Sequence, residues 1–284
     1  MKPFSKRGSG LLAVGGVVFA VVLVLALIWL RSGERLPQAN GYDDFVKAGR
    51  ALSGRASDVD SKDAAQVAAF AAKNSTLPIQ IRNGLAKECR VPVEFKAAWF
   101  TSHMGDMMAL KQAGYALELL AKEREAAGAF DEAITLRLDA VRMGIESYRG
   151  GLLIDYLIGT AVEIWSLKNL TQMASRLDAV QCRRVLKIAA ESDQTRETLD
   201  SITRRDREWS WLGSGWWESW DGIKEMAGDI FKQPSGDLLG RQRELKAARG
   251  KLNLALARRA FELEQGRAPA NDAELIPKYL LSLP

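Results

Sequence analysis

The chain has 284 residues, of which 47% are hydrophobic and 26% are charged. This balance is typical of a folded globular protein and excludes disorder over most of the length. The formal net charge is +5. Because Lys and Arg are interspersed with Asp and Glu along the chain, the charge pattern favours a solvated helical surface, and we expect no nucleic-acid partner.

The first predicted element is a membrane span. The run that begins at Leu11 and ends at Leu30 contains no charged or polar side chain. As a helix it would measure about 30 Å, which is the thickness of a bilayer core. Trp29 stands at the end of the run, where its amphipathic ring suits the membrane interface. The sequence therefore predicts one transmembrane helix, with the lipid bilayer as its partner.

The charges that flank this run predict its orientation. Lys2, Lys6 and Arg7 precede it, whereas Arg31 and Arg35 follow it with Glu34 between them. This bias places residues 1–10 in the cytoplasm and the main domain outside it, on the inner membrane of a bacterial cell. The alternative is a cleaved secretory signal, whose apolar region is only about 7–15 residues long and is followed by small residues. Residues 28–31 are a poor cleavage site, so we favour an uncleaved anchor.

A linker at residues 31–41 separates the predicted anchor from a predicted α-helical domain at residues 42–284. Pro37 and Gly41 are its breakers. The first helices of the domain are predicted at residues 42–52, 61–73 and 79–89, and Asp63 lies close to the start of the second.

The clearest helical periodicity starts at Met107. Apolar residues recur three or four apart up to Ala121, and again from Ile134 to Tyr148. Gly128 separates the two stretches. Their short connection predicts an antiparallel helical hairpin.

This hairpin resembles a tetratricopeptide unit at a set of signature positions: Leu120, Ala121, Gly128, Phe130, Ala133 and Ala140. The resemblance covers about one unit of 34 residues. It departs at Arg124 and Arg137, where an aromatic or apolar residue is usual. No second copy follows at the same period, and an ordinary helical hairpin is the alternative interpretation.

Residues 152–173 are apolar nearly all round and are interrupted by Asp155, Glu163 and Lys168. Because of these charges, the stretch is predicted to be a central core helix and not a second membrane span. Asp178 is predicted to cap the next helix. A charged helix is expected at about residues 194–207.

Five tryptophans crowd into a short segment: Trp209, Trp211, Trp216, Trp217 and Trp220. Tryptophan has a large apolar face and one donor, so it suits interfaces of any kind. The cluster has three interpretations: a loop packed onto the domain, a contact with the bilayer surface, or a protein-binding patch. It is the candidate interaction patch of the sequence.

The last predicted helix ends at Gly266, and Pro269 prevents its resumption. Asn271, with Glu274 three residues later, predicts the start of a short helix that folds back. Residues 257–284 resemble the C-terminal signature of an uncharacterised family of bacterial single-pass membrane-anchored helical proteins. They are also similar to the segment after the long helix of type II secretion pseudopilins, through Phe261, Gly266 and Pro269. The pseudopilin cleavage motif is absent from the stretch before the apolar run.

The sequence contains little that predicts chemistry. His103 is its one histidine, so two-His metal sites are excluded; we expect it at the surface or in a hydrogen bond. Phosphate-loop and dinucleotide motifs are absent. The carboxylates Glu118, Glu123 and Glu125 are interpreted as solvated helix faces. We therefore predict no catalytic, cofactor-binding or metal residues.

The cysteines Cys89 and Cys182 fall in separate predicted helices. Two cysteines make neither a disulfide framework nor a zinc site. Their pairing requires an oxidising compartment and a fold that brings them together, and the sequence leaves both outcomes open.

The hypothesis that follows is a protein-interaction or scaffolding component of the bacterial cell envelope, whose protein partners are unknown. The alternatives are a component related to a type II secretion or pilus-like system and an extracytoplasmic hydrolase that uses carboxylates.

Overall fold

The computed structural model describes Val22, residues 36–212 and residues 238–282. The predicted anchor, apart from Val22, lies outside the described residues, as do Trp216, Trp217 and Trp220. The anchor therefore stays a prediction. Within the described ranges, no helix is long and apolar enough to cross a membrane. The compact unit that begins at Gln38 is described below by itself.

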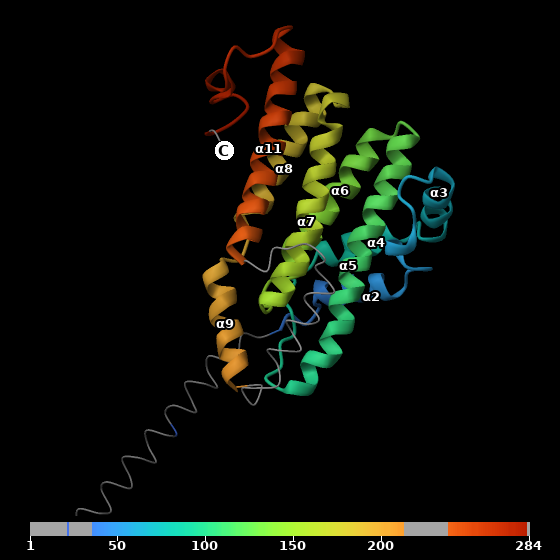
Figure 1. The fold of residues 1–284 in the computed structure, drawn as a ribbon, viewed down its shortest axis with the longest axis vertical. Coiled ribbons are helices and arrows are strands. Elements are labelled where there is room, and N and C mark those ends of the chain that lie inside the picture. Colours follow the sequence, from blue (N-terminus) through green and yellow to red (C-terminus); the bar gives the residue numbers. More distant parts are fainter. Residues whose placement is uncertain (1–21, 23–35, 213–237, 283–284) are drawn as a thin grey trace, which may run out of the picture. The chain divides into compact units, whose positions relative to one another are not determined.

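The domain is mainly helical, as predicted, and its described part contains no β-strand. Figure 1 shows the helices in chain order. They are α2 (Gly41–Arg50), α3 (Ala64–Lys73), α4 (Leu77–Leu85), α5 (Ala97–Ala126), α6 (Phe130–Glu146), α7 (Leu153–Met173), α8 (Ala179–Gln194), α9 (Leu199–Leu212) and α11 (Leu238–Gln265). Short 3-10 turns are η1 (Ala56–Asp58), η2 (Ala174–Arg176) and η3 (Asp272–Leu275).

The helices pack in two layers. In one layer α2 contacts α5, α5 contacts α7, and α7 contacts α11. In the other layer α4 contacts α6, and α6 contacts α8. The predicted hairpin of α5 and α6 is present, and α7 packs against both of its helices. The α5–α6 hairpin therefore joins the two layers, since α5 belongs to one of them and α6 to the other.

Side-chain caps and glycines set the helix ends. Asp63 accepts hydrogen bonds from two amide N–H groups in the first turn of α3, at 2.9 and 3.2 Å. Asp178 accepts from the third residue of α8 at 2.8 Å. The predicted Asp178 cap is confirmed, and Asp63, which the sequence places close to a helix start, is the cap of α3. Gly128 follows α5 with φ +78°, a left-handed conformation that glycine adopts without strain.

The core is divided into two clusters, and α6 and α7 contribute to both. These two helices cross at Gly144 and Gly159. A Cβ atom on Gly159 would lie 2.4 Å from the Gly144 carbonyl oxygen. The two backbones are thus in direct contact, and this close crossing fixes α7 against the α5–α6 hairpin. The predicted core helix of residues 152–173 is α7.

The C-terminal segment folds back onto α11. Gly266 has φ +67°, and Asn271 caps the turn η3 by accepting from an amide N–H at 3.0 Å. The Tyr279 hydroxyl donates to Glu264 at 2.8 Å, and the Tyr279 ring packs on Phe261 with the centroids 5.8 Å apart. The predicted turn is therefore confirmed as a local feature of the fold.

Candidate binding groove

The two described members of the tryptophan cluster lie in opposite surroundings. Trp209 is 2% exposed, and its indole N–H donates to the carbonyl oxygen of Glu94 at 2.8 Å. Trp211, also on α9, is 81% exposed. Their side chains therefore do not share one patch. Trp209 packs α9 onto the domain beside Trp99, with ring centroids 6.0 Å apart.

Of the two positions expected for His103, the structure shows the hydrogen-bonded one: the side chain is buried and does not lie at the surface. Its Nε2 atom lies 2.7 Å from Oδ1 of Asp155, and both side chains are 0% exposed. Asp155 also accepts from the Leu152 N–H at 2.8 Å, at the start of α7. The His103 ring stacks on Trp99 with centroids 4.3 Å apart. A general base must reach its substrate, so this enclosed pair serves to join α5 to α7.

The expectation of a solvated Glu118 was wrong. The residue is 1% exposed, because α5 is covered by α6 on one side and α7 on the other. Arg137 donates to Glu118 at 3.2 Å, and Asn169 does so at 2.8 Å. Burial raises the pKa of Glu118, and the Arg137 guanidinium acts in the opposite direction. Arg137, which departs from the tetratricopeptide pattern, is thus the partner of this buried carboxylate.

Cys89 and Cys182 are free thiols buried in different core clusters. They do not pair in this structure. Burial raises the pKa of Cys89 to about 12 and that of Cys182 to about 11. Such thiols are rarely ionised near neutral pH, so neither cysteine is activated as a nucleophile.

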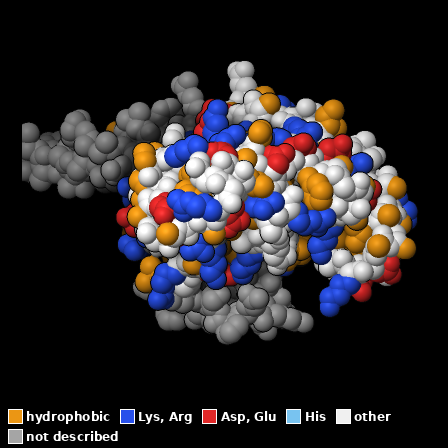
Figure 2. Space-filling model, turned by 90° about the horizontal axis from the view of Figure 1, so that it is seen from above, with side chains coloured by type: hydrophobic (Ala, Val, Ile, Leu, Met, Phe, Trp, Pro, Cys, Tyr) orange, Lys and Arg blue, Asp and Glu red, His pale blue; other side chains and the backbone are white. Residues whose placement is uncertain are grey.

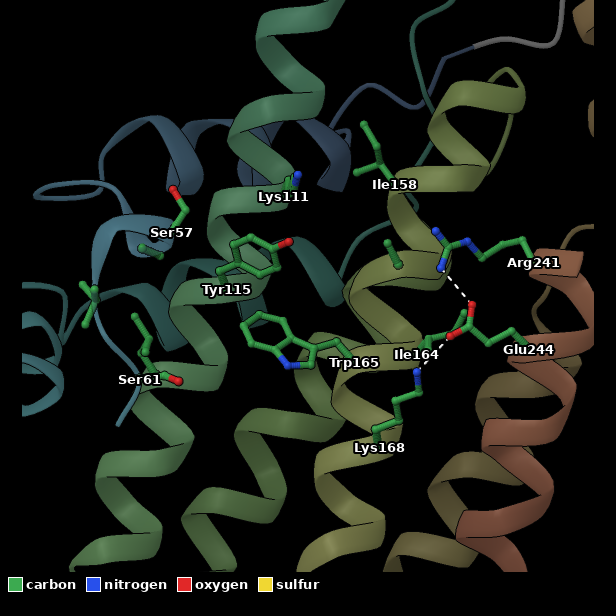
Figure 3. A pocket seen from close by; sticks show the side chains of 14 residues that line it. Ser57, Ser61, Lys111, Tyr115, Ile158, Ile164, Trp165, Lys168, Arg241 and Glu244 are labelled. Atoms are coloured by element: carbon green, nitrogen blue, oxygen red, sulfur yellow. Dashed lines mark hydrogen bonds and ion pairs between the residues drawn. The ribbon is translucent and has the colours of Figure 1, made fainter. Parts of the chain in front are cut away.

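A groove of about 520 Å³ opens on the layer that contains α5 and α7. One wall is the segment around η1 and the other is the start of α11. Figure 3 shows the side chains that line it. We call it the Trp165 groove. The lining residues labelled in the figure are Ser57, Ser61, Lys111, Tyr115, Ile158, Ile164, Trp165, Lys168, Arg241 and Glu244.

Helical spacing brings the floor of the Trp165 groove together. Lys111 and Tyr115 are four residues apart on α5, and Trp165 and Lys168 are three apart on α7, so each pair shares one helix face. The Tyr115 and Trp165 rings meet edge to face, with centroids 4.4 Å apart and planes at 89°. Edge-to-face contacts between aromatic rings are favourable, so this pair forms a well-packed apolar surface.

The rim of the Trp165 groove carries more positive than negative charge. Glu244 accepts from Lys168 at 2.8 Å and from Arg241 at 3.1 Å. These contacts, led by the Lys168 hydrogen bond, lower the pKa of Glu244. The Lys111 ammonium lies 5.7 Å from the centroid of the Tyr115 ring, and no carboxylate in the described ranges is ion-paired with it. Burial lowers the pKa of Lys111.

This arrangement is suited to binding. An aromatic floor with cations at its rim attracts a ligand that is both apolar and anionic. The described lining contains neither His nor Cys, and two cations already engage its carboxylate. Among the residues that the structure describes, no group of three His, Cys, Asp or Glu side chains is placed to hold a metal ion.

Asp43 and Asp106 line a separate depression, which is the candidate site for a reaction that uses carboxylates. Burial, together with Asp44 and Asp106, raises the pKa of Asp43. Arg50 forms an ion pair with Asp106 across this depression. An ion-paired carboxylate is a weaker base than a free one, so the depression favours no particular reaction.

On the face of the molecule that Figure 2 shows, the charges do not gather by sign. Figure 2 shows Lys and Arg interspersed with Asp and Glu on the face seen from above, with small apolar areas between them. This mixture agrees with the expectation of a solvated surface.

Sequence reasoning did not single out the residues of the Trp165 groove. Trp165 was included in a core helix, and Lys111 lay within an amphipathic pattern. A signal was present, since each of two neighbouring helices places a lysine one turn from an aromatic residue. Comparison of the chain with family models, with curated proteins and with solved structures found no match, so the functional inference rests on the groove itself.

Proposed function

We propose that this protein is a membrane-anchored interaction domain of the bacterial cell envelope. Its Trp165 groove binds a segment of a partner protein that presents an apolar side chain beside a carboxylate. The observation that carries this proposal is Lys111, a partly buried ammonium group above an aromatic floor. In the described ranges it has no ion-pair partner.

The physical basis is the cost of desolvating a cation. Lysine side chains usually extend so that the ammonium stays in water. The pKa of Lys111 is lowered by burial, which means that the fold disfavours its charged form. The Tyr115 ring supplies only a weak compensating attraction at 5.7 Å. A bound carboxylate would stabilise this cation. Ligand binding therefore supplies the ion-pair partner that Lys111 lacks within the described ranges.

The shape of the groove favours a protein segment as the ligand. Its walls come from separate elements, which are the segment around η1 and the helices α5, α7 and α11. Grooves between helices accept peptide segments through a few apolar anchors. The Tyr115–Trp165 pair offers the aromatic surface on which such an anchor packs.

The predicted anchor gives this binding a location. A single helix at residues 11–30 would hold the domain on the extracytoplasmic side of the inner membrane, where it meets other envelope proteins. The predicted anchor supports a scaffolding role, because an anchored domain with a peptide groove would keep its partner near the membrane.

The test is a selection from a library of random twelve-residue peptides displayed on phage, using the full chain in detergent micelles. We expect enrichment of peptides with an acidic residue next to an aromatic or large aliphatic one. The variant Trp165→Ala should lower the affinity for these peptides at least tenfold. The matched control is Trp211→Ala, which removes an exposed tryptophan outside the groove and should leave binding unchanged.

Two outcomes would overturn the proposal. Selected peptides that bind Trp165→Ala as well as the unaltered chain would show that the groove is not their site. The other outcome concerns vesicles that contain phosphatidylglycerol. If they bind the chain in a Trp165-dependent way and the peptides do not, the groove recognises lipid and not protein.

A further inference from the structure

Another depression lies beside the Trp165 groove, further along the helices α5 and α7. Its volume is about 370 Å³. We name it the Arg176 depression after the exposed cation at its edge. Its lining residues are Lys122, Glu125, Ala126, Arg137, Asn169, Gln172 and Arg176.

The groove and the depression lie on the same helix faces. On α5, Lys122 is seven residues after Tyr115, and on α7, Gln172 is seven residues after Trp165. Seven residues are two helical turns, which place a side chain on the same face about 10 Å further along. The Lys122 ammonium lies 3.5 Å from the carbonyl oxygen of Ser61, a residue that lines the Trp165 groove. The two hollows therefore adjoin on the seam between α5 and α7.

The Arg176 depression also has a cation without an ion pair. No carboxylate in the described ranges is ion-paired with Lys122, whose contact is the Ser61 carbonyl. Arg176 is 50% exposed, donates to Glu125 at 2.5 Å, and stacks over the Phe130 ring at 4.6 Å. The stacking and the ion pair hold the guanidinium in place, although the side chain as a whole is half exposed. Arg176 is thus positioned to accept a second anionic partner.

Arg137 places a buried positive charge at the bottom of the depression. It is 3% exposed and bridges Glu118 and Glu125, at 3.2 and 2.7 Å. The three cations of the depression thus face two carboxylates, one of them deeply buried. One positive charge, that of Lys122, is therefore not balanced by a carboxylate among the described residues.

We infer that the Arg176 depression is a second anion subsite for the ligand of the Trp165 groove. The bound segment carries a second carboxylate, about three residues from its apolar anchor, which Lys122 and Arg176 hold. This inference rests on the proposed function. The spacing follows because about 10 Å of seam corresponds to three residues of a polyproline II segment, at about 3.1 Å each, and side chains three residues apart in such a segment share one face.

An extended segment fits the seam better than a helix does. Packed helices have their axes about 8–10 Å apart, so the furrow between them is narrow. A helix with its side chains is about 10–12 Å wide. An extended polyproline II chain can place side chains three residues apart in the two hollows without that width.

The experiment uses fluorescein-labelled nine-residue peptides and the full chain in detergent micelles, with fluorescence anisotropy as the readout. In the first peptide Phe is followed by Glu, and a second Glu stands three positions after the Phe. In the second peptide this second Glu is Gln, and in the third it stands six positions after the Phe. We expect the first peptide to bind about threefold to fivefold more tightly than the others.

The protein variant Lys122→Gln should abolish this preference and bind all three peptides alike. Lys122 is the chosen position because its removal breaks no described ion pair. The matched control is Lys251→Gln, an exposed lysine of α11 outside both hollows, which should keep the preference.

The outcomes separate this inference from the proposed function. If Trp165→Ala weakens binding of the first peptide but Lys122→Gln keeps the preference for its second Glu, only the second subsite is overturned. Equal binding of the first and third peptides to the unaltered chain would also overturn it. If none of the peptides binds at millimolar concentration, the proposed function fails as well.

Discussion

The domain contains two kinds of charged region, which differ in how their charges are balanced. In the interior, Glu163 is fully buried and faces Arg196, whose two terminal nitrogens lie 2.5 and 3.0 Å from it. The same guanidinium donates to the Tyr148 hydroxyl at 2.7 Å. On the seam between α5 and α7, by contrast, Lys111 and Lys122 have no ion-pair partner in the described ranges.

This difference separates charges that serve the fold from charges that are available to a ligand. A buried charge is tolerated only when its neighbours compensate it, because desolvation costs several kcal/mol. Glu163 satisfies that condition within the chain. The two lysines are less buried, so the fold can leave their compensation to a partner. The predictions below test this division.

The largest effect is expected when the interior balance is broken. Arg196→Met removes the main partner of Glu163 and should lower the free energy of unfolding by about 3 kcal/mol. Urea denaturation followed by circular dichroism measures this change. Peptide binding by the folded fraction should stay the same. A loss below about 1 kcal/mol would contradict the structural role assigned to the pair.

A second interior test is the crossing of α6 and α7. Gly159→Ala would place a methyl group 2.4 Å from the Gly144 carbonyl oxygen. Because backbone atoms cannot move aside cheaply, we expect a loss of about 2 kcal/mol in the same denaturation assay. The matched control is Gly105→Ala on α5, where a Cβ atom meets nothing within 4 Å. It should be neutral or stabilising by up to about 1 kcal/mol. Equal effects of the two substitutions would show that the helices do not cross closely.

The fold was largely predictable because its signals are local. Periodic apolar residues predicted the α5–α6 hairpin, a run that is apolar nearly all round predicted α7, and Asp178 predicted a helix start. The prediction for α5 began at Met107, whereas the helix begins at Ala97. Its first turns are held by His103, which bonds a residue of α7, and a local pattern cannot show that contact.

The groove could not be predicted because its walls are distant in the chain. Lys111 and Arg241 line one hollow, although 130 positions separate them. Glu118 was assigned to a solvated face because a periodic pattern shows one apolar side of a helix, not the number of its neighbours. Its burial depends on α7, which covers the remaining side. Local patterns therefore predict helices but not which polar residues they enclose.

A smaller effect is expected at Asp206, a carboxylate of α9 that accepts from the Leu153 N–H at 3.1 Å. Burial, and then the nearby Asp155, raise its pKa. A folded-state pKa above the unfolded value means that the folded state binds the proton more tightly. Stability is therefore lost as the pH rises from the unfolded value of about 3.9 through the raised folded value.

Asp206→Asn keeps the acceptor and removes the charge, so it should stabilise the domain at pH 7 by less than about 1 kcal/mol. The gain should shrink as the pH falls and vanish below about pH 3.9. Urea denaturation at a series of pH values measures it. Asp200→Asn, at an exposed position of the same helix, should give no gain. A gain that is independent of pH would show that the Asp206 charge is not its cause.

The smallest change in stability is expected at Lys111, and it bears most directly on function. Lys111→Met keeps the length and apolar stem of the side chain but removes the ammonium group, whose charged form is disfavoured by burial. The free energy of unfolding should therefore rise by about 0.5 kcal/mol. The affinity for the acidic peptides should fall about fivefold, because their carboxylate loses its cation. A residue kept for the fold would change both quantities in the same direction, whereas a residue kept for a ligand changes them in opposite directions. Lys251→Met, at an exposed site on α11, should leave both nearly unchanged. If Lys111→Met lowers stability, the ammonium has a role inside the domain, and the division between the interior charges and those of the seam does not hold.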